Sequence, residues 1–445
     1  MGASAGGLEA FQRFFSNLPA DNGTAFVLVQ HLDPRHATLL PELLGKATQM
    51  LVEQVKDETP VQPNHVYVIP ANATLTIEEG IVRVAPAESK VPRMPIDSLF
   101  YSLAEDQGPN AICILFSGSG TDGTLGLRAV KEHGGMVMAQ TPESAQHDPM
   151  LRSAISTGLV DHVLPPEKLA DKLIEYVAYL RTTRGGTSLL NDELSQIYHL
   201  VRRQTGHDFS QYKTSTLSRR IQRRMQVLQV AGVREYISIL RKDAEEVERL
   251  FRDLLISVTH FFRDQRAWEI LATEVIPEIV EHAAAEEQLR VWIPGCATGE
   301  EAYSIAILVK EAMLQRQVKP KVQIFAGDID EEALAFARQA TYPEGITEHV
   351  SPERLERFFV KQDHRFHVVK EIREMVVFST HDLIKDPPFS RLDLIICRNL
   401  LIYLETDLQR FVTNLFHYAL RPAGFLFLGP SESVAGPPEL FRSVD

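Results

Sequence analysis

Short apolar runs of strand length alternate with helical stretches from residue 2 to about residue 180. The runs predicted to form strands are residues 25–29, 66–69, 111–116 and 135–139. The stretches with apolar positions at helical spacing are residues 8–18, 96–105 and 125–132. The length of the apolar runs is typical of strands, and the spacing of apolar positions in the other stretches is typical of helices. Their alternation is typical of a parallel sheet covered by helices on both faces.

The pattern changes twice in the rest of the chain. A basic, glycine-containing stretch predicts a linker at residues 183–188, after domain 1–182. Residues 189–276 have helical spacing only, which predicts an all-helical subdomain. Strand-like runs then return at residues 289–293, 322–326, 375–378, 392–396 and 424–428.

We therefore predict an α/β fold with two doubly wound, mostly parallel-sheet domains, joined through the small helical subdomain. The second of these domains is expected at residues 277–445 and to contain a small β insertion.

Composition narrows the class of protein. The 445 residues suffice for two to three domains. No apolar run approaches the roughly 18 residues that cross a bilayer. Three widely separated cysteines favour a reducing, cytoplasmic location over disulfides and give no support for a metal site. The net charge of −13 disfavours nucleic acid as a ligand.

Ser4, His31 and Asp122 form the first candidate site. Ser4 lies in a glycine-rich turn, and the other two each follow an apolar run. A serine becomes a nucleophile when a histidine takes its proton and a carboxylate orients that histidine. The carboxyl ends of parallel strands would bring the three together. A phosphate-binding glycine turn with an unrelated histidine and aspartate remains the alternative.

The Ser4 turn should follow a strand, but only Met1 to Ala3 precede it. We therefore expect the first strand of the sheet to be missing from this sequence, through truncation or a misplaced start.

Several motifs in residues 1–180 resemble the catalytic domain of the bacterial chemotaxis methylesterase family, CheB. They are GASAGG at residues 2–7, QH at 30–31, NHVYVIP at 64–70, PIDSLF at 95–100 and GSGTDG at 118–123. The resemblance implies that Ser4 is the nucleophile, His31 the general acid and base, and Asp122 the orienting carboxylate. Ala5 and Ser119 replace the family's usual threonine and methionine. No receiver domain precedes the motifs, so control has to come from elsewhere.

The second candidate site is a turn at Gly295 to Gly299, followed by Asp328 at the end of the next predicted strand. A glycine-rich turn allows close approach of the backbone, and a carboxylate accepts hydrogen bonds from ribose hydroxyls. The turn lacks the full GxGxxG pattern, which argues against a nicotinamide cofactor. A generic nucleotide pocket remains open as an interpretation.

Residues from about 189 to the end resemble the chemotaxis receptor glutamate methyltransferase family, CheR. The motifs are FFR at residues 261–263, GEEAYS at 299–304, DID at 328–330, CRN at 397–399, IY at 402–403 and GPSES at 429–433. The resemblance implies S-adenosylmethionine (SAM) as cofactor and chemoreceptor glutamates as substrate. A glutamate is ionised at pH 7, so such a site has to align the acceptor rather than deprotonate it.

The resemblance also assigns cofactor contacts. Thr259 and Arg263 would meet the methionine part, Glu300 the amino group and Asp328 the ribose. The remaining predicted residues are Asp382 and Leu383 at the adenine, together with Gly295, Arg398 and Asn399. Asp382 stands where the family has asparagine. Arg263 and Tyr403 would position donor and glutamate, although a purely structural ion pair is an alternative for Arg263.

A basic helix is predicted at residues 213–225, with Arg219, Arg220, Arg223 and Arg224 on one broad face. It would dock an acidic receptor helix, or it is simply a solvated face. The family's β insertion can bind a receptor's C-terminal peptide. Here residues 359–374 are short and lack glycine, so we do not expect tail-tethered recognition.

The leading hypothesis is a fused methylesterase and methyltransferase for receptor glutamates; the same hydrolysis would also deamidate glutamine. Because two fully active halves would form a futile cycle, partners or conformation should select one activity at a time. A signalling scaffold whose sites bind without turnover is the alternative. A nucleic-acid methyltransferase fits poorly, since the chain is acidic and has no Asn-Pro-Pro-Tyr tetrad.

Overall fold

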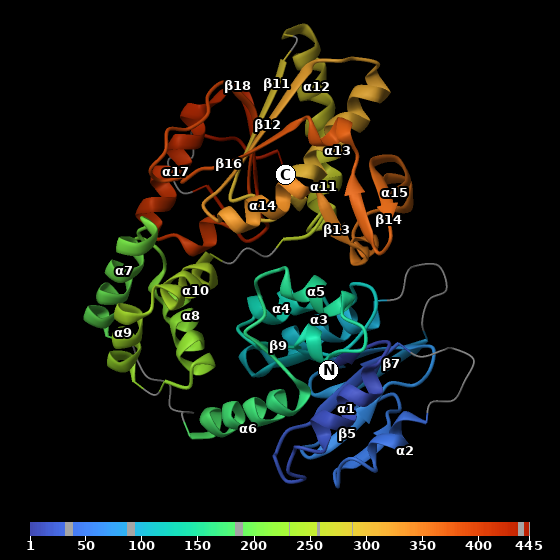
Figure 1. Cartoon of the computed structure of the whole chain (residues 1–445). Coiled ribbons are helices and arrows are strands. Elements are labelled where there is room, and N and C mark those ends of the chain that lie inside the picture. Colours follow the sequence, from blue (N-terminus) through green and yellow to red (C-terminus); the bar gives the residue numbers. More distant parts are fainter. Residues whose placement is uncertain are drawn as a thin grey trace.

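A computed structural model describes the chain except residues 32–38, 87–93, 183–189, 231, 256–258, 287, 435–439 and 445. The predicted linker at 183–188 lies outside the described residues. In Figure 1 the two sheets lie one above the other, with a group of helices to one side. Among the described residues, no helix has both the length and the apolar character needed to cross a bilayer.

The N-terminal domain is built on a seven-stranded sheet in which every neighbouring pair is parallel. Its order is β10 (His162–Leu164), β9 (Met136–Gln140), β8 (Ile112–Leu115), β1 (Gly2–Ala3), β2 (Phe26–Gln30), β5 (His65–Val68) and β3 (Leu51–Gln54). A small antiparallel sheet adds β4 (Thr59–Pro60), β7 (Ile81–Pro86) and β6 (Ala73–Glu78).

Helices cover both faces of the seven-stranded sheet, as predicted. One apolar core includes residues of α1 (Gly7–Phe15), α2 (Leu40–Leu44) and α6 (Pro166–Thr182). The other includes residues of α3 (Pro95–Gln107), α4 (Gly126–Glu132) and α5 (Pro149–Ile155). Two single turns, η1 (Gly108–Asn110) and η2 (Pro142–Ser144), complete the domain.

The first strand, expected to be missing, is present as β1 in the middle of this sheet. Gly2 pairs with Val29 on one side and Leu115 on the other. The strand has two small residues and no apolar run, so periodicity could not reveal it. Small size is required there because a Cβ at Gly2 would lie 2.4 Å from Ile96.

An all-helical part follows, with a core of its own. Its helices are α7 (Asn191–Thr205), α8 (Thr214–Val227), α9 (Val233–Lys242) and α10 (Ala244–Leu255). A π-helical turn, η3 (Leu271–Val275), separates α11 (Gln265–Ile270) from α12 (Ile276–Glu286), which leads into the second sheet.

The second sheet is five-stranded and wholly parallel, and each of its predicted strands is found. Its order is β16 (Val376–Thr380), β12 (Lys321–Asp328), β11 (Gln288–Pro294), β17 (Leu392–Cys397) and β18 (Leu420–Leu428). The connecting elements are α13 (Glu300–Arg316), α14 (Glu331–Gln339), η5 (Leu401–Tyr403) and α17 (Thr406–Ala419). The predicted fold class is therefore confirmed.

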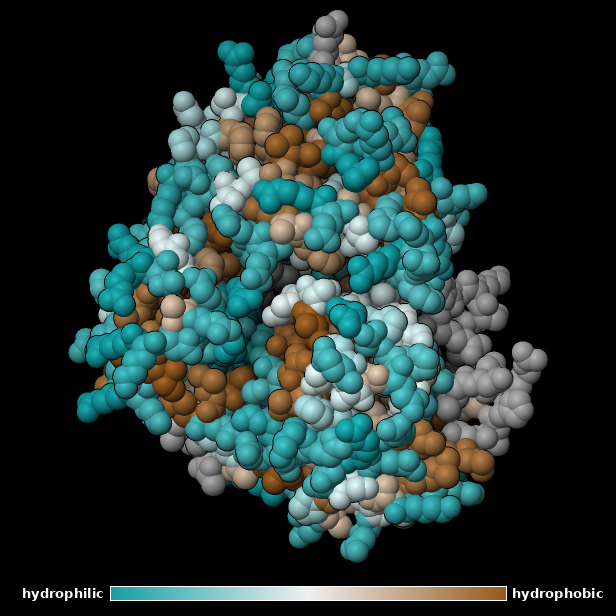
Figure 2. All heavy atoms as spheres, viewed as in Figure 1, coloured by the Kyte–Doolittle hydropathy of each residue, from teal (hydrophilic) through white to brown (hydrophobic). Residues whose placement is uncertain are grey.

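A small β insertion lies between β12 and β16. It comprises β13 (Thr341–Pro343), η4 (Glu344–Glu348), α15 (Pro352–Phe358), β14 (Phe359–Gln362), β15 (Arg365–Val368) and α16 (Lys370–Arg373). Its three strands are antiparallel. In the view of Figure 2 the surface is mainly hydrophilic and recedes where the helical part meets the two sheet domains.

Candidate active sites

The serine and histidine of the first site lie at the ends of neighbouring strands. Ala3 of β1 pairs with Gln30 of β2, so Ser4 and His31 come next at the same level. The Ser4 N–H donates to Ser117 O (3.0 Å), and the His31 N–H donates to Ala3 O (3.2 Å). Tertiary structure thus brings both side chains to one edge of the sheet, where parallel sheets place their ligand sites.

Asp122 holds the imidazole of His31. Its Oδ2 lies 2.6 Å from His31 Nε2, and the carboxylate also accepts backbone N–H bonds from Ile96 (3.0 Å), Asp97 (2.9 Å) and Gly123 (2.8 Å). Two of those donors belong to the first turn of α3, whose dipole favours a negative charge. Nδ1 is therefore the ring nitrogen left to accept a proton from a hydroxyl.

The loop after β8 packs directly on Ser4. A Cβ at Gly118 would lie 2.9 Å from Ser4 Cβ, and the Ser117 hydroxyl donates to Ala5 O at 2.8 Å. No hydrogen bond joins Ser4 Oγ to His31 within the described part of the chain; such bonds often tighten only when substrate binds. The backbone N–H of Ser119 can serve an oxyanion whatever its side chain.

The β insertion of the second domain packs against the Asp122 side of this site. The Glu344 N–H donates to Thr121 Oγ1 at 3.1 Å. Gly345 fits because it has no side chain; a Cβ there would lie 2.8 Å from Leu125 Cδ1 and 3.2 Å from Asp97 Oδ2. The loop that carries Asp122 therefore contacts both His31 and the β insertion.

Acidic groups gather at that contact. Burial and the charge of Asp122 raise the pKa of Asp97 well above its ordinary value. Loss of surrounding water and the charge of Asp122 raise the pKa of Glu348 to about 7, although part of its side chain stays exposed. Asp97 Oδ2 has no hydrogen-bond partner among the described residues. Both carboxyls are thus biased toward the protonated form.

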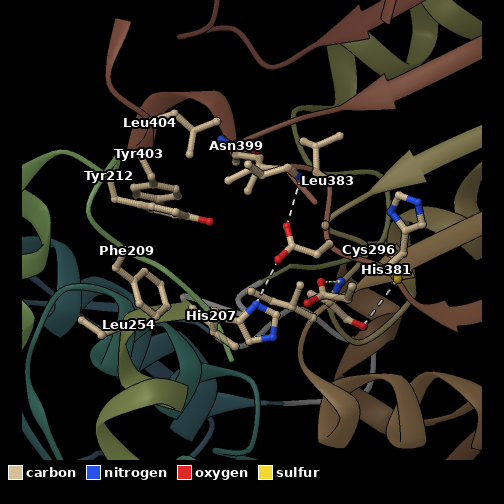
Figure 3. A pocket seen from close by; sticks show the side chains of 18 of the residues that line it. His207, Phe209, Tyr212, Leu254, Cys296, His381, Leu383, Asn399, Tyr403 and Leu404 are labelled. Atoms are coloured by element: carbon tan, nitrogen blue, oxygen red, sulfur yellow. Dashed lines mark hydrogen bonds and ion pairs between the residues drawn. The ribbon is translucent and has the colours of Figure 1, made fainter. Parts of the chain in front are cut away.

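The second site is a cavity of about 340 Å³ between the helical part and the five-stranded sheet. Figure 3 shows Phe209, Tyr212 and Leu254 on one side of it and Cys296 and His381 on the other. The predicted residues that line it are Thr259, Arg263, Gly295, Asp328, Asp382, Leu383, Arg398, Asn399 and Tyr403. Its volume is typical of a small-molecule site.

Asp328 is held by the glycine turn that precedes α13. Its carboxylate accepts the N–H of Ala297 (2.7 Å) and of Asp330 (2.9 Å). Burial outweighs these bonds and raises the pKa of Asp328 to about 6. A carboxylate has room for further acceptor bonds, so Asp328 can receive hydroxyl hydrogens from a ligand.

Asp382 pairs with a histidine of the helical part. Its Oδ2 lies 3.2 Å from His207 Nδ1, as the dashed line in Figure 3 shows. Burial would raise the pKa of Asp382, but the bonds from His207 and the Ile384 N–H, with the charge of Lys385, lower it to about 2. The carboxyl group of Asp382 is therefore ionised at neutral pH, and the apolar Leu383 follows it in the chain.

The structure differs from the prediction at Glu300. That side chain is not part of the cavity wall; it turns toward the N-terminal domain, where its Oε1 meets Arg128 Nη1 at 3.0 Å. Glu301 lines the cavity instead and pairs with Arg398 at 3.0 Å. The motif contains two adjacent glutamates, and helical geometry sends neighbours to different faces, so spacing could not choose between them.

The turn at Arg398 and Asn399 is held from the end of the chain. Glu432 accepts the N–H groups of Asn399 (2.8 Å), Leu400 (2.9 Å) and Leu401 (2.7 Å). Asn399 itself has a positive φ of 57°. The GPSES motif thus supports the cavity wall without entering it.

The helical part contributes side chains that the sequence patterns did not indicate. His207, Phe209 and Tyr212 come from the connection between α7 and α8. This connection is tied to the sheet domain by an isolated bridge between Tyr212 and Leu404. Two aromatic residues just after the helix-ending Gly206 were the available signal, but their spacing equally suits a core.

The basic helix α8 is not the exposed docking face that was predicted. Arg219 is exposed, but Arg220, Arg223 and Arg224 are 8%, 4% and 5% exposed. Arg223 bonds Asp161 (2.6 Å) and Asp253 (2.7 Å), and Arg224 bonds Glu246 (2.6 Å). The basic side chains are neutralised inside the protein because acidic residues distant in sequence surround them.

Family models match three successive parts of the chain. Residues 1–173 match the family model of the CheB methylesterase. Residues 192–255 match the all-alpha domain of the CheR methyltransferase, and residues 257–445 match its SAM binding domain.

Individual relatives cover the chain to different extents. The "Uncharacterized 104.1 kDa protein in hypE 3'region" of Rhodobacter capsulatus is 36% identical over 422 residues, which are 89% of this chain and 44% of that protein. The chain thus spans less than half of that relative. A chemotaxis protein methyltransferase of Borreliella burgdorferi is 31% identical, covering 56% of this chain and 90% of its own length. The CheB catalytic domain of Thermotoga maritima is 31% identical with a TM-score of 0.37, covering 39% of this chain and 95% of that one.

Proposed function

We propose that this one polypeptide both adds methyl groups to glutamate side chains of chemoreceptors and removes them. The chain belongs to the chemotaxis protein methyltransferase family and also carries a CheB methylesterase domain. The observation that carries this proposal is the assembly of both sites in one chain. A serine beside an aspartate-held histidine lies at the carboxyl ends of the strands of the seven-stranded sheet. An aspartate-anchored cavity lies beside the five-stranded sheet.

The residues of the cavity fit SAM. Asp328 suits the ribose hydroxyls, Leu383 and the ionised Asp382 suit the adenine ring and its amino group, and the Glu301–Arg398 pair suits an amino acid end. When bound, SAM supplies a methyl group on a positively charged sulfur. The protein has to align a carboxylate that is already ionised. Arg263 and Tyr403 line the cavity and would hold that carboxylate in place.

The hydrolytic half would work through Ser4. Ser4 Oγ attacks the ester carbonyl while His31 takes its proton, and the same proton then leaves with methanol. Water, activated by His31, next releases the glutamate from the serine. Backbone N–H groups of the loop at Ser119 would stabilise the oxyanion. A glutamine side chain would follow the same course with ammonia as the leaving group.

The β insertion offers a way to keep the two reactions apart. Because Glu344 and Gly345 pack on the loop that carries Asp122, the methyltransferase domain can restrain the hydrolytic site of its own chain. Release of this contact by a receptor or an upstream signalling module would then start hydrolysis.

The test is incubation with radiolabelled SAM and a panel of receptors, followed by measurement of protein-bound label and volatile methanol. Asp328→Ala should weaken SAM binding in calorimetry about 10- to 100-fold, the size of one hydrogen bond to a charged group, and labelling at a limiting SAM concentration should fall with it. Ser4→Ala should leave labelling intact and abolish methanol release. SAM binding without labelling, and no methanol from a methylated receptor, would favour the scaffold.

SAM binding should also weaken at low pH. The pKa of Asp328 is raised to about 6 in the free protein. Since ribose hydroxyls donate to the ionised form, affinity should fall as the pH drops through 6. An Asp328→Asn protein should lack that pH dependence.

A further inference from the structure

Helix α4 of the methylesterase half directs three charged side chains at the methyltransferase half. It starts just after Asp122, and its last turns carry Arg128, Lys131 and Glu132. Each of the three forms an ion pair with a different segment of the rest of the chain. We propose that α4 is a positioning element of the SAM site, in which Arg128 and Glu132 act on methyl transfer. This inference rests on the proposed methyltransferase function.

Arg128 binds the loop between β11 and α13, residues 295–299, from the side of the esterase half. Its Nη1 lies 3.0 Å from Glu300 Oε1 and 3.3 Å from Thr298 Oγ1, while Thr298 Oγ1 donates to Glu300 Oε2 at 2.6 Å. The side chains of Arg128 and Glu300 are 4% and 3% exposed. Such a buried pair is sensitive to loss of either partner.

The same loop has its other side in the cavity. Gly295, Cys296 and Ala297 line it, and the Ala297 N–H holds Asp328. Arg128 therefore acts on the cavity wall through a loop only a few residues long. A shift of this loop would move the N–H donor that orients the predicted ribose-binding carboxylate.

Glu132 acts on a side chain that lines the cavity itself. Glu132 Oε1 lies 3.5 Å from Arg263 Nη2, and each side chain is 25% exposed. Arginine has several rotatable bonds, so a fixed negative charge restricts where its guanidinium points. Arg263 is the residue proposed to align donor and glutamate. Glu132 would thus set the orientation of that group from the other domain.

Lys131 anchors α4 between these two contacts. Its Nζ lies 2.7 Å from Asp161 Oδ1 and 3.1 Å from Asp253 Oδ1. Asp253 belongs to α10, and the next residues, Leu254 and Leu255, line the cavity. All three α4 residues lie in the part matched by the CheB family model. The residues that line the methyltransferase cavity are therefore held in part by residues of the esterase half.

The experiment uses the full chain with Glu132→Gln, Arg128→Met and the double variant Arg128→Met with Glu300→Gln. The double variant removes the buried pair without leaving a lone charge. Arg152→Met is the matched control, because Arg152 is an exposed arginine of α5 that pairs with Asp148, the residue just before that helix. SAM affinity is measured by calorimetry, and methyl transfer is resolved into KM and kcat.

The expected effects differ between the variants. Arg128→Met and the double variant should raise the Kd and KM for SAM severalfold. Glu132→Gln should lower kcat more than it raises the KM for SAM. Methanol release and Tm of Glu132→Gln should stay at the wild-type values, and Arg128→Lys should recover part of the affinity. Arg152→Met should change none of these.

The inference is overturned if Glu132→Gln and the double variant bind SAM and transfer methyl groups as the wild type does. A variant that loses SAM affinity and Tm together, with methanol release also lost, shows a purely structural role and overturns it as well. A wild-type chain that transfers no methyl group instead refutes the proposed function.

Discussion

Two of the contacts that the esterase half makes with the rest of the chain have opposite electrostatic character. Toward α8 and α10 it joins a buried cluster of three cations, Lys131, Arg223 and Arg224, with three anions, Asp161, Glu246 and Asp253. At its contact with the β insertion, carboxyl groups of the esterase half face a carboxyl group of the insertion. Asp97 and Asp122 face Glu348 there, and His31 is bound to Asp122.

The difference suggests which contact is permanent and which can open. In the balanced cluster burial opposes ionisation, but the charges of Arg223 and Lys131 keep the pKa of Asp161 below its ordinary value. At the insertion, burial and like charges act in the same direction and raise the pKa of Asp97. We infer that the balanced contact holds the two halves together, while the acidic one is poised for release.

Removing a cation from the balanced cluster should have the largest effect. Arg223→Ala leaves Asp161 and Asp253 buried without their bonds to this side chain, which should cost about 3–5 kcal/mol of unfolding free energy. Urea unfolding checks this, with Arg219→Ala on the same helix as control. A loss below about 1 kcal/mol would show that the cluster does not hold the contact.

Crowding the acidic contact should have the next largest effect. A side chain at Gly345 would collide with Leu125, so Gly345→Val should weaken the contact by about 1–3 kcal/mol. Methanol release from a methylated receptor should rise as the insertion moves away. Gly232→Val is the control, because nothing lies within 4 Å of a Cβ there. A folded Gly345→Val protein with unchanged release would refute restraint by the insertion.

A smaller effect is expected from pH. The pKa of Glu348 is about 7 at the contact and 4.5 ordinarily, so the closed contact binds the extra proton. Its stability is greatest below pH 4.5, falls as the pH rises toward 7, and stays constant above. Methanol release should therefore gain about two- to fivefold between these pH values, the size typical of partly exposed charges.

Glu348→Gln should lose this gain in methanol release. Glu353→Gln, at an exposed site of the neighbouring α15, should behave as the wild type. The same pH profile in all three proteins would contradict a role for Glu348.

The smallest effect is expected outside both contacts. Arg219 is the exposed arginine of the basic helix, so Arg219→Glu should change the unfolding free energy by no more than about 0.5 kcal/mol. Its effect on receptor methylation at low and moderate salt tests whether this one exposed arginine of α8 docks a receptor. Unchanged methylation would leave α8 with an internal role only.

Several features could be predicted from sequence because they are local. The strands β8 and β12 are apolar runs bounded by glycine or polar residues, and period and length identify them directly. Ser4 and Asp328 each stand at a strand end beside glycines. Such motifs carry their own geometry, so residue order alone was enough to propose the two kinds of site. β1 escaped because a two-residue strand has no period.

The sequence by itself thus determined the α/β class, the helical part between the sheets and the two kinds of chemistry, since these depend on neighbours along the chain. Tertiary structure alone decided that Glu300 and Arg223 face the esterase half and that the insertion packs beside Asp122. Whether a charge is exposed or buried depends on partners far away in the sequence, and only folding brings those partners to it.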